Sequence, residues 1–351
     1  MRKPNLSWLL ILVPVSLAVD LATNQELATF LTAAGAIIPL AGLIGRGTDQ
    51  LALHAGPRVG GLLNATFGNV TELIISIFLI SKGELDIVKA SLIGSIIGNL
   101  LLVLGLSFLL GGLKHKEQEF NARSAAVHSS SMLLAVIGLV MPALFVLSAG
   151  RQSSVQRQVV SVTVAAILIA LYVAALVFTL VTHEHLFRTT ASGECPEWSA
   201  RAALLVLIGA TALVAVESEI LVGALEPALA DLGLSRFFVG LVVVPVIGNA
   251  AEHSSAVSMA LRNKVDVTLE IATGSSTQIA LFVAPVLVFI SLALGHPMDF
   301  VFDTFEVVAV GLSTLIVAVI SLDGRSNWLE GAQLVAAYAI MAISFFFVRS
   351  L

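Results

Sequence analysis

Long apolar runs alternate with short polar links along almost the whole chain. The eleven longest are close to the length of about 20 residues that an α-helix needs to cross the hydrocarbon core of a bilayer. They occupy residues 7–23, 27–45, 59–80, 86–111, 127–148, 157–182, 201–223, 237–261, 267–294, 304–322 and 328–348. This pattern predicts an all-α integral membrane protein with about eleven transmembrane helices.

The polar links mark the ends of these helices and divide the chain. Most are short and charged, such as Lys82-Gly83-Glu84 and Arg262-Asn263-Lys264. The longest, from Thr182 to Ser199, lies in the middle of the sequence. We therefore expect four parts. They are a first helix within residues 1–24, a first half over 25–183, a cytoplasmic linker over 184–200 and a second half over 201–351.

Composition narrows the function classes. Hydrophobic residues make up 58% of the chain and charged residues only 12%, whereas soluble domains have about 25% charged residues. A water-soluble enzyme is therefore excluded, and the expected partner is the lipid bilayer, with room for an oligomer. The net charge of −5, without a basic stripe, excludes a nucleic-acid partner. The single cysteine, Cys195, excludes a disulfide framework or a multi-thiolate metal site.

The distribution of Lys and Arg predicts the orientation in the membrane. With eleven helices, the side that holds the N-terminus collects twelve of these residues and the opposite side six. Because positive residues accumulate in cytoplasmic loops, the N-terminus is expected in the cytoplasm. An odd number of helices then places the C-terminus outside.

The strongest signal is an internal repeat. At an offset of 180 residues, Gly68-Asn69-Val70-Thr71-Glu72 aligns with Gly248-Asn249-Ala250-Ala251-Glu252, and Gly94-Ser95 aligns with Gly274-Ser275. The paired G-N-x-x-E motifs lie in the third and eighth apolar runs, so the two copies should cross the bilayer in opposite directions. Such inverted repeats are common in secondary transporters. We expect two inverted five-helix repeats preceded by one extra N-terminal helix.

Each motif places a glutamate deep inside an apolar run. A carboxylate at the bilayer centre costs at least about 2.5–3.5 kcal/mol, so it needs a partner or a water-filled cavity. Asn69 and Glu72 are three residues apart and share one helix face, as do Asn249 and Glu252. The preceding Gly68, Gly248 and Pro245 would loosen the helix backbone, which is tolerated where the helix lines a cavity. The repeat therefore predicts one shared site for both acids.

The expected ligands are all oxygen atoms, which suit a hard cation such as Ca²⁺ rather than zinc or copper. Two buried carboxylates also repel each other unless they bind a cation or hold protons. Glu72 and Glu252 are thus candidates for both Ca²⁺ binding and proton binding. Competition between the two occupants would itself be an exchange mechanism.

Polar residues in the fourth and ninth apolar runs are candidate supporting ligands, with ordinary interhelical hydrogen bonding as the alternative. They are Ser95, Asn99, Ser275 and Gln278. No Lys or Arg falls in the middle third of any apolar run, so a structural ion pair does not explain the glutamates. His253, next to Glu252, is a candidate proton relay or a packing residue.

A second set of acids lies near the ends of the second and seventh runs. Asp49 is expected near the cytoplasmic end of the former, and Glu217 and Glu219 near the external end of the latter. They would either concentrate cations at the mouths of the site or simply cap the helix ends in solvent.

The motifs resemble the signature repeats of the calcium/proton exchanger (CAX) family, within the calcium/cation antiporter superfamily. Further segments agree, including Gly274-Ser275-Ser276-Thr277-Gln278 and Asn327-Trp328-Leu329-Glu330-Gly331. The resemblance implies an eleven-helix fold and Ca²⁺ efflux driven by the proton gradient, with no cofactor. It also implies alternating access gated by the second and seventh helices, around Glu72 and Glu252. Because the long N-terminal extension and the strongly acidic central loop of many eukaryotic members are missing, we expect a prokaryotic plasma membrane.

Three alternatives remain at this point. A Na⁺/Ca²⁺ exchanger, or one coupled to another monovalent cation, would share the architecture, although sodium coupling usually needs several separate cation sites. An intramembrane enzyme is disfavoured because the chain has no H-E-x-x-H motif and no nucleophile arrangement. A calcium channel would be distinguished by flux that persists when the proton gradient is abolished.

Overall fold

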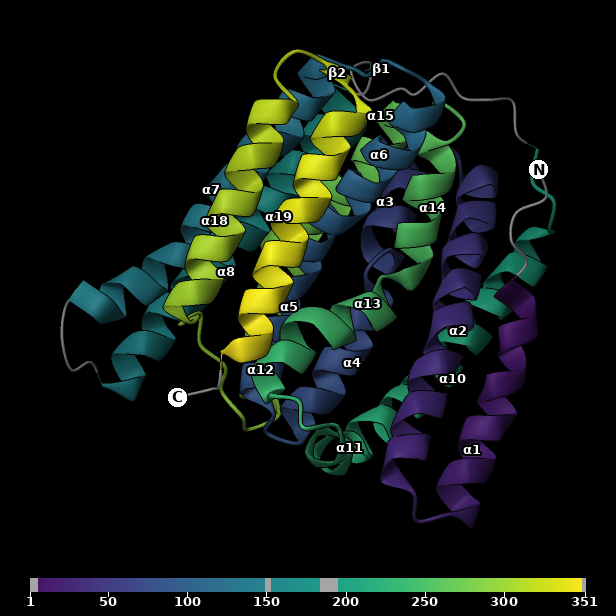
Figure 1. Ribbon diagram of the computed structural model, residues 1–351, viewed down its shortest axis with the longest axis vertical. Helices are drawn as coiled ribbons and strands as arrows, with labels where there is room; N and C mark the ends of the chain where they lie inside the picture. The colour runs from purple at the N-terminus through teal and green to yellow at the C-terminus, as the bar shows by residue number, and fades with distance from the viewer. Residues whose placement is uncertain (1–5, 149–152, 184–194, 349–351) are drawn as a thin grey trace.

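The computed structural model describes residues 6–148, 153–183 and 195–348, and these form a bundle of helices (Figure 1). The first half contains η1 (Leu6–Ile11), α1 (Leu12–Ala22), α2 (Glu26–Ala55), α3 (Pro57–Phe67), α4 (Val70–Ser81), α5 (Leu85–Ile97), η2 (Gly98–Val103), α6 (Leu104–Lys114), α7 (Ala122–Ser148), α8 (Ser154–Val177) and η3 (Phe178–Thr182). Here η1 is a 3₁₀ helix, and η2 and η3 are π-helical turns. The all-α prediction is confirmed.

The second half follows the same plan with more interruptions. It contains α10 (Ala200–Gly223), α11 (Leu225–Leu232), α12 (Arg236–Phe238), η4 (Val239–Val243), α13 (Val244–Gly248), α14 (Ala250–Ala260), α15 (Val265–Leu269), η5 (Glu270–Gly274), α16 (Ser275–Gln278), η6 (Ile279–Val283), α17 (Ala284–Ala293), α18 (Thr304–Ile320) and α19 (Trp328–Phe347). The turns η4, η5 and η6 are π-helical. The two-residue strands β1 (Gln118–Glu119) and β2 (Arg325–Ser326) pair antiparallel, joining two loops at one end of the bundle.

Many of these helices are long enough for a membrane. In the described residues, eight are long and apolar enough to cross a bilayer, or nine if α11 and the bent segment Arg236–Gly248 count as one span. The segments Trp8–Ala22 and Thr304–Ile320 are shorter apolar helices. All eleven apolar runs predicted from the sequence fall mainly in helix. Their number as membrane crossings stays a prediction.

Helix ends form where the sequence supplies capping side chains. Ser153 and Gln156 form a reciprocal capping box at the start of α8, and Asp303 and Glu306 form another at the start of α18. Asn327 accepts hydrogen bonds from two backbone N–H groups at the start of α19. These contacts satisfy backbone donors that the first turn of a helix leaves unpaired.

The buried apolar side chains form two separate clusters. The larger one extends through most of the bundle and is centred on α5, η2 and α17. The smaller one joins α1, α2 and α10 and consists of Val13, Ala36, Leu40, Ile44, Leu207, Ala210 and Val214. These three helices stand together along one edge of the molecule, at the right in Figure 1. The N-terminal helix therefore packs on α2 and α10, apart from the larger core.

The packing of α1 on α2 is close because glycine occupies the contact. A Cβ at Gly35 of α2 would lie 2.8 Å from Leu12 Cδ1 of α1. Residues 184–194 of the predicted linker lie outside the described residues. The same holds for residues 1–5 and 349–351, the chain ends whose sides of the membrane the sequence predicts.

Candidate cation site

Each G-N-x-x-E motif interrupts the helix that carries it. The first interruption separates α3 from α4 at Gly68 and Asn69, and the second separates α13 from α14 at Asn249. Asn69 has φ −107° and ψ 23°, and Asn249 has φ −95° and ψ 8°, so both leave the α-helical region for the sparsely populated bridge region. A broken helix inside a membrane is tolerated where it is buried in protein or lines a cavity.

The two broken helices run in opposite directions. In Figure 1 the chain descends from α3 to α4 and rises from α13 to α14. The repeat also appears in the next helices, where the π-helical turns η2 and η6 lie at equivalent positions: Ile279–Val283 minus 180 is 99–103, inside Gly98–Val103. This arrangement is what the inverted repeat predicts.

Glu72 and Glu252 occupy the first turns that follow the breaks. Asn69 O accepts a hydrogen bond from Leu73 N at 3.1 Å, and Asn249 O accepts one from His253 N at 2.9 Å, so each asparagine begins the new helix. The N-terminus of a helix carries a partial positive charge, which favours a carboxylate nearby. Both glutamates therefore gain local support that does not require a basic side chain.

The two motifs meet in space. The Glu72 side chain lies against the backbone of Gly248, where an added Cβ would be 3.1 Å from Glu72 Cγ and 3.4 Å from Glu72 Oε1. Glu72 is also close enough to Glu252 for their charges to interact. Two acids that are distant in sequence thus share one site, and its glycine leaves the space that the first acid fills.

Hydrogen bonds hold each motif to the opposite half of the molecule. Asn249 Nδ2 donates to Ser95 Oγ at 3.1 Å, and Ser275 Oγ donates to Asn69 Oδ1 at 2.8 Å. Asn69 and Ser275 are the repeat equivalents of Asn249 and Ser95. Each asparagine is therefore positioned by the serine of the other repeat, and the two contacts are related by the internal symmetry.

Two further residues break this symmetry. Asn69 Nδ2 donates to Gln278 Oε1 at 2.8 Å, and Asn99 Nδ2 donates to Ser275 Oγ at 3.2 Å. Their repeat equivalents are apolar, because Gly98 corresponds to Gln278 and Ile279 corresponds to Asn99. The Asn69 side of the site is consequently tied into a chain of four polar residues.

The Asn249 side of the site has fewer partners. Asn249 Nδ2 donates only to Ser95 Oγ and to Pro245 O, which lies one turn earlier in the same helix. Asn249 Oδ1 accepts no hydrogen bond from any described residue, although the side chain is only 1% exposed. A buried acceptor without a donor is costly, so this oxygen calls for a proton donor or a cation.

The glutamates show the same deficit of donors. Both carboxylate oxygens of Glu72, and Oε2 of Glu252, accept no hydrogen bond within the described part of the chain. Glu72 is buried, Glu252 is partly buried, and the Ser275 hydroxyl interacts with Glu252. The unsatisfied atoms of this site are all oxygen acceptors. Protons or a hard cation are the species that would satisfy them.

The number of acidic ligands in the site is small. The described residues contain no group of three or more His, Cys, Asp and Glu side chains that could hold a metal ion. A cation between Glu72 and Glu252 would therefore complete its coordination with amide, hydroxyl, backbone or water oxygens. Such a set suits Ca²⁺, which takes about 6–8 oxygen ligands in flexible geometry.

The other predicted site residues lie apart from this cluster. Asp49 and Glu219 are exposed near the ends of α2 and α10, so their role at the mouths of the site stays a prediction. His253 is partly buried and forms no side-chain hydrogen bond with another described residue, which leaves the proton-relay prediction untested. Glu217 is 0% exposed and lies inside the protein rather than at a mouth. Two residues along a helix turn the side chain by about 200°, so Glu217 and Glu219 occupy different faces of α10.

The structure also pairs two residues that the sequence analysis missed. His128 Nε2 of α7 lies 2.9 Å from Glu270 Oε2 of η5. Glu270 is a charged residue within an otherwise apolar run, which was an available signal. Its partner was not predictable, because His128 comes from a helix far away in the sequence.

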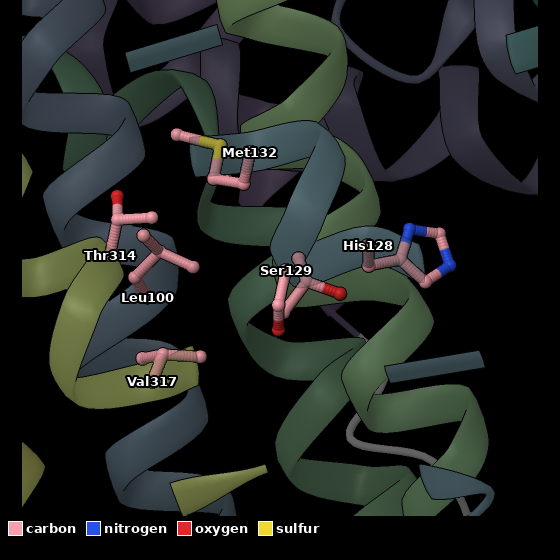
Figure 2. Close-up of a pocket in the computed structure, with 7 residues that line it drawn as sticks. Leu100, His128, Ser129, Met132, Thr314 and Val317 are labelled. Atoms are coloured by element: carbon pink, nitrogen blue, oxygen red, sulfur yellow. The ribbon is translucent and has the colours of Figure 1, made fainter. Parts of the chain in front are cut away.

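A small cavity of about 10 Å³ lies beside this pair (Figure 2). It is lined by Leu100, His128, Ser129, Met132, Thr273, Thr314 and Val317. A volume of this size holds about one water molecule. None of the residues of the two motifs lines it, so this cavity is separate from the candidate cation site.

Comparison with known proteins agrees with this geometry. The family described as sodium/calcium exchanger protein matches residues 26–181 and 202–347, which cover both halves of the repeat. The chain belongs to this family. The resemblance predicted from the motifs is thereby confirmed, together with an all-α, multi-pass membrane fold.

Members of the family from other organisms are similar over almost their full length. A Ca(2+)/H(+) antiporter from Aphanothece halophytica is 45% identical and aligns over 97% of this chain and 95% of its own. The Ca(2+)/H(+) antiporter ChaA from Bacillus subtilis is 47% identical over 95% of this chain and 96% of its own.

Solved structures show the same architecture. The structure of native YfkE superimposes with a TM-score of 0.85 at 43% identity, covering 97% of this chain and all of that one (100%). The H⁺/Ca²⁺ exchanger CAX superimposes with a TM-score of 0.75, covering 97% of this chain and 91% of that one. The identity in the second case is 14%, so this likeness concerns the fold alone.

Proposed function

We propose that this protein is a secondary active Ca²⁺/H⁺ antiporter, a transporter rather than an enzyme, that moves Ca²⁺ out of the cytoplasm against inward proton flow. The observation that carries the proposal is the cluster of buried, unsatisfied acceptor oxygens on Glu72, Glu252 and Asn249. The names of the similar antiporters support the choice of ions. Ca²⁺ and protons are the substrates, and no cofactor is required.

The chemistry of the site makes the two substrates exclude each other. Two carboxylates balance the charge of one Ca²⁺, while the amide and hydroxyl oxygens complete its coordination. When Ca²⁺ leaves, Glu72 and Glu252 repel each other in a region of low dielectric, and proton uptake relieves that repulsion. A protonated carboxyl then has an O–H group that can donate to Asn249 Oδ1. Ca²⁺ removes the need for these protons, so its binding releases them.

The internal symmetry supports alternating access to this site. We assign the two inverted repeats to residues 25–183 and 201–351, with an extra helix within residues 1–24 and a cytoplasmic linker over 184–200. The separate packing of α1, α2 and α10 suits a gating unit that shifts against the larger core. Eleven crossings, with the N-terminus in the cytoplasm and the C-terminus outside, complete the proposed topology in the plasma membrane.

The sodium-coupled alternative receives less support from the same site. It calls for several separate cation sites, whereas the described residues bring only Glu72 and Glu252 together around the broken helices. We therefore favour proton coupling with one shared site.

Transport into proteoliposomes tests the proposal. The purified protein is reconstituted, the interior is acidified, and Ca²⁺ uptake is followed in sodium-free buffer. We expect uptake that stops when an uncoupler abolishes the pH gradient. Uptake that appears only with a sodium gradient would establish the alternative exchanger. Uptake that follows the Ca²⁺ gradient and ignores the uncoupler would establish a channel.

A further inference from the structure

A second buried acid lies outside the cation site. Glu217 is on α10, and its carboxylate oxygens are fully enclosed, since the residue is 0% exposed. Ser16 on α1 and the neighbouring Ser218 are also 0% exposed. The acid therefore lies in the interface that the N-terminal helix forms with α10.

The polar surroundings of Glu217 contain no positive charge. The Ser16 hydroxyl lies beside the Glu217 carboxyl, and the charged group that acts on it is Asp20, which is also acidic. No Lys, Arg or His in the described ranges forms an ion pair with Glu217. The interface around it is apolar, because Val13 of α1 and Val214 of α10 belong to the same hydrophobic cluster.

An ionised carboxylate is poorly suited to this position. Burial of a charge without a counter-ion is costly, and the nearby Asp20 makes it more so. One hydroxyl group can satisfy only part of a carboxylate. A neutral carboxylic acid avoids the charge and gains an O–H donor for Ser16 Oγ, which accepts no other hydrogen bond in the described structure.

The internal repeat separates this acid from the cation site. The alignment of Thr48 with Ser218, at an offset of 170 residues, makes Gly47 the counterpart of Glu217. A Cβ at Gly47 would lie 3.3 Å from Ala203 O of α10, so that position is a close helix contact and not a ligand position. The helix α1 has no counterpart in the second repeat either. The acid and the helix that covers it therefore depart from the symmetry together.

We propose that Glu217 remains protonated throughout the exchange cycle and that its carboxylic acid donates a hydrogen bond to Ser16, which fastens the N-terminal helix α1 to α10. Glu217 is then a positioning residue. It neither binds the transported cation nor takes part in proton exchange. The inference does not depend on the identity of the transported ions, because it concerns a contact outside the cation site.

Infrared spectroscopy of the purified, reconstituted protein tests the protonation directly. We expect the carbonyl stretching band of a protonated carboxyl group to persist into mildly alkaline buffer, and Glu217→Gln to remove that component. Glu219→Gln is the matched control, because it changes an exposed acid two residues away on the same helix and should leave the band unchanged. An alkaline spectrum that is identical in the wild type and Glu217→Gln would overturn the proposal.

Stability measurements test the contact with Ser16. An amide resembles a neutral acid, so Glu217→Gln should keep the melting temperature and most of the Ca²⁺ uptake. Glu217→Ala and Ser16→Ala should each lower the melting temperature, and the double variant should lower it by less than the sum. Additive losses would refute the pairing, and loss of uptake in a folded Glu217→Gln protein would show that the ionised acid is needed. These readouts remain informative even if the transported ions are not Ca²⁺ and protons.

Discussion

The side chain of Glu72 packs directly on the backbone of Gly248, so the acid of one motif occupies the space that the glycine of the other leaves open. This contact joins the two repeats at the atoms proposed to carry the chemistry. It also explains why a glycine precedes the second asparagine, since any larger residue would enter the volume of the Glu72 carboxyl. The relationship leads to a direct test.

We expect Gly248→Ala to lower Ca²⁺/H⁺ exchange by roughly tenfold, because a displacement of a few tenths of an ångström misplaces a charged ligand. The added Cβ would lie 3.3 Å from Glu72 Cδ, which is closer than an ordinary contact. The control is Gly311→Ala on α18, where an added Cβ meets no atom within 4 Å. Initial rates of Ca²⁺ uptake in proteoliposomes provide the comparison. Equal rates for both variants would show that the contact is not important for exchange.

Replacing either glutamate by its amide should abolish exchange. Glu72→Gln and Glu252→Gln each keep the shape of the side chain but remove a charge that balances Ca²⁺ and a proton-binding oxygen. We expect uptake to fall by at least about 100-fold, in line with the loss of a charged interaction of about 3 kcal/mol. The exposed Glu117→Gln serves as the control. Normal transport by either folded variant would contradict the proposed site.

The unsatisfied oxygen of Asn249 predicts an unequal role for the two asparagines. Asn249→Ala removes an acceptor that is available to a cation, so the half-saturating Ca²⁺ concentration should rise by roughly tenfold, or about 1.4 kcal/mol. Asn99→Ala should have a smaller effect on it, because Asn99 contacts the site only through Ser275. The two values are measured from the Ca²⁺ dependence of uptake. A larger effect at Asn99 would argue against Asn249 Oδ1 as a ligand.

Glu84 predicts a pH dependence of stability at a helix end outside the membrane. Partial burial raises the pKa of Glu84 above its ordinary value, although Arg236, with Nη1 3.5 Å from Glu84 Oε2, lowers it. The nearby acids Glu226 and Asp86 raise the pKa further. The folded protein therefore takes up a proton here at a pH at which the unfolded chain has lost it. The contribution of Glu84 to stability is present at low pH and falls as the pH rises through this range.

Glu84→Gln isolates this contribution. The variant should melt at a higher temperature relative to the wild type at neutral pH than at about pH 4, where the glutamate is protonated in both states. Melting curves recorded across this range in one detergent give the comparison. A difference between the two proteins that does not change with pH, or that changes in the opposite direction, would contradict the assignment.

The sequence predicted the parts of the site that the repeat specifies. The offset of 180 residues identified the two glutamates, the two asparagines and their paired serines, since each motif carries its own copy of the broken helix. It did not predict that Gln278 and Asn99 both support the Asn69 side, because the partners of a buried amide depend on how α5, η2 and α16 pack. The burial of Glu217 was missed for a similar reason, since it depends on the position of α1 beside α10. The pair His128 and Glu270 joins two helices that no sequence motif connects.

Competition between Ca²⁺ and protons for one site also predicts a pH-dependent effect of Ca²⁺ on stability. A ligand that binds only the folded protein stabilises it by about 2.7 kcal/mol at 100 times its dissociation constant. Ca²⁺ should therefore raise the melting temperature of the wild type at mildly alkaline pH. The increase should shrink as the pH falls, because protons occupy Glu72 and Glu252 and must leave before Ca²⁺ binds. Glu252→Gln should show little increase at any pH, whereas Glu117→Gln should behave as the wild type. A Ca²⁺-induced increase that is independent of pH would mean that the two substrates bind at separate sites, and the shared-site mechanism would then be wrong.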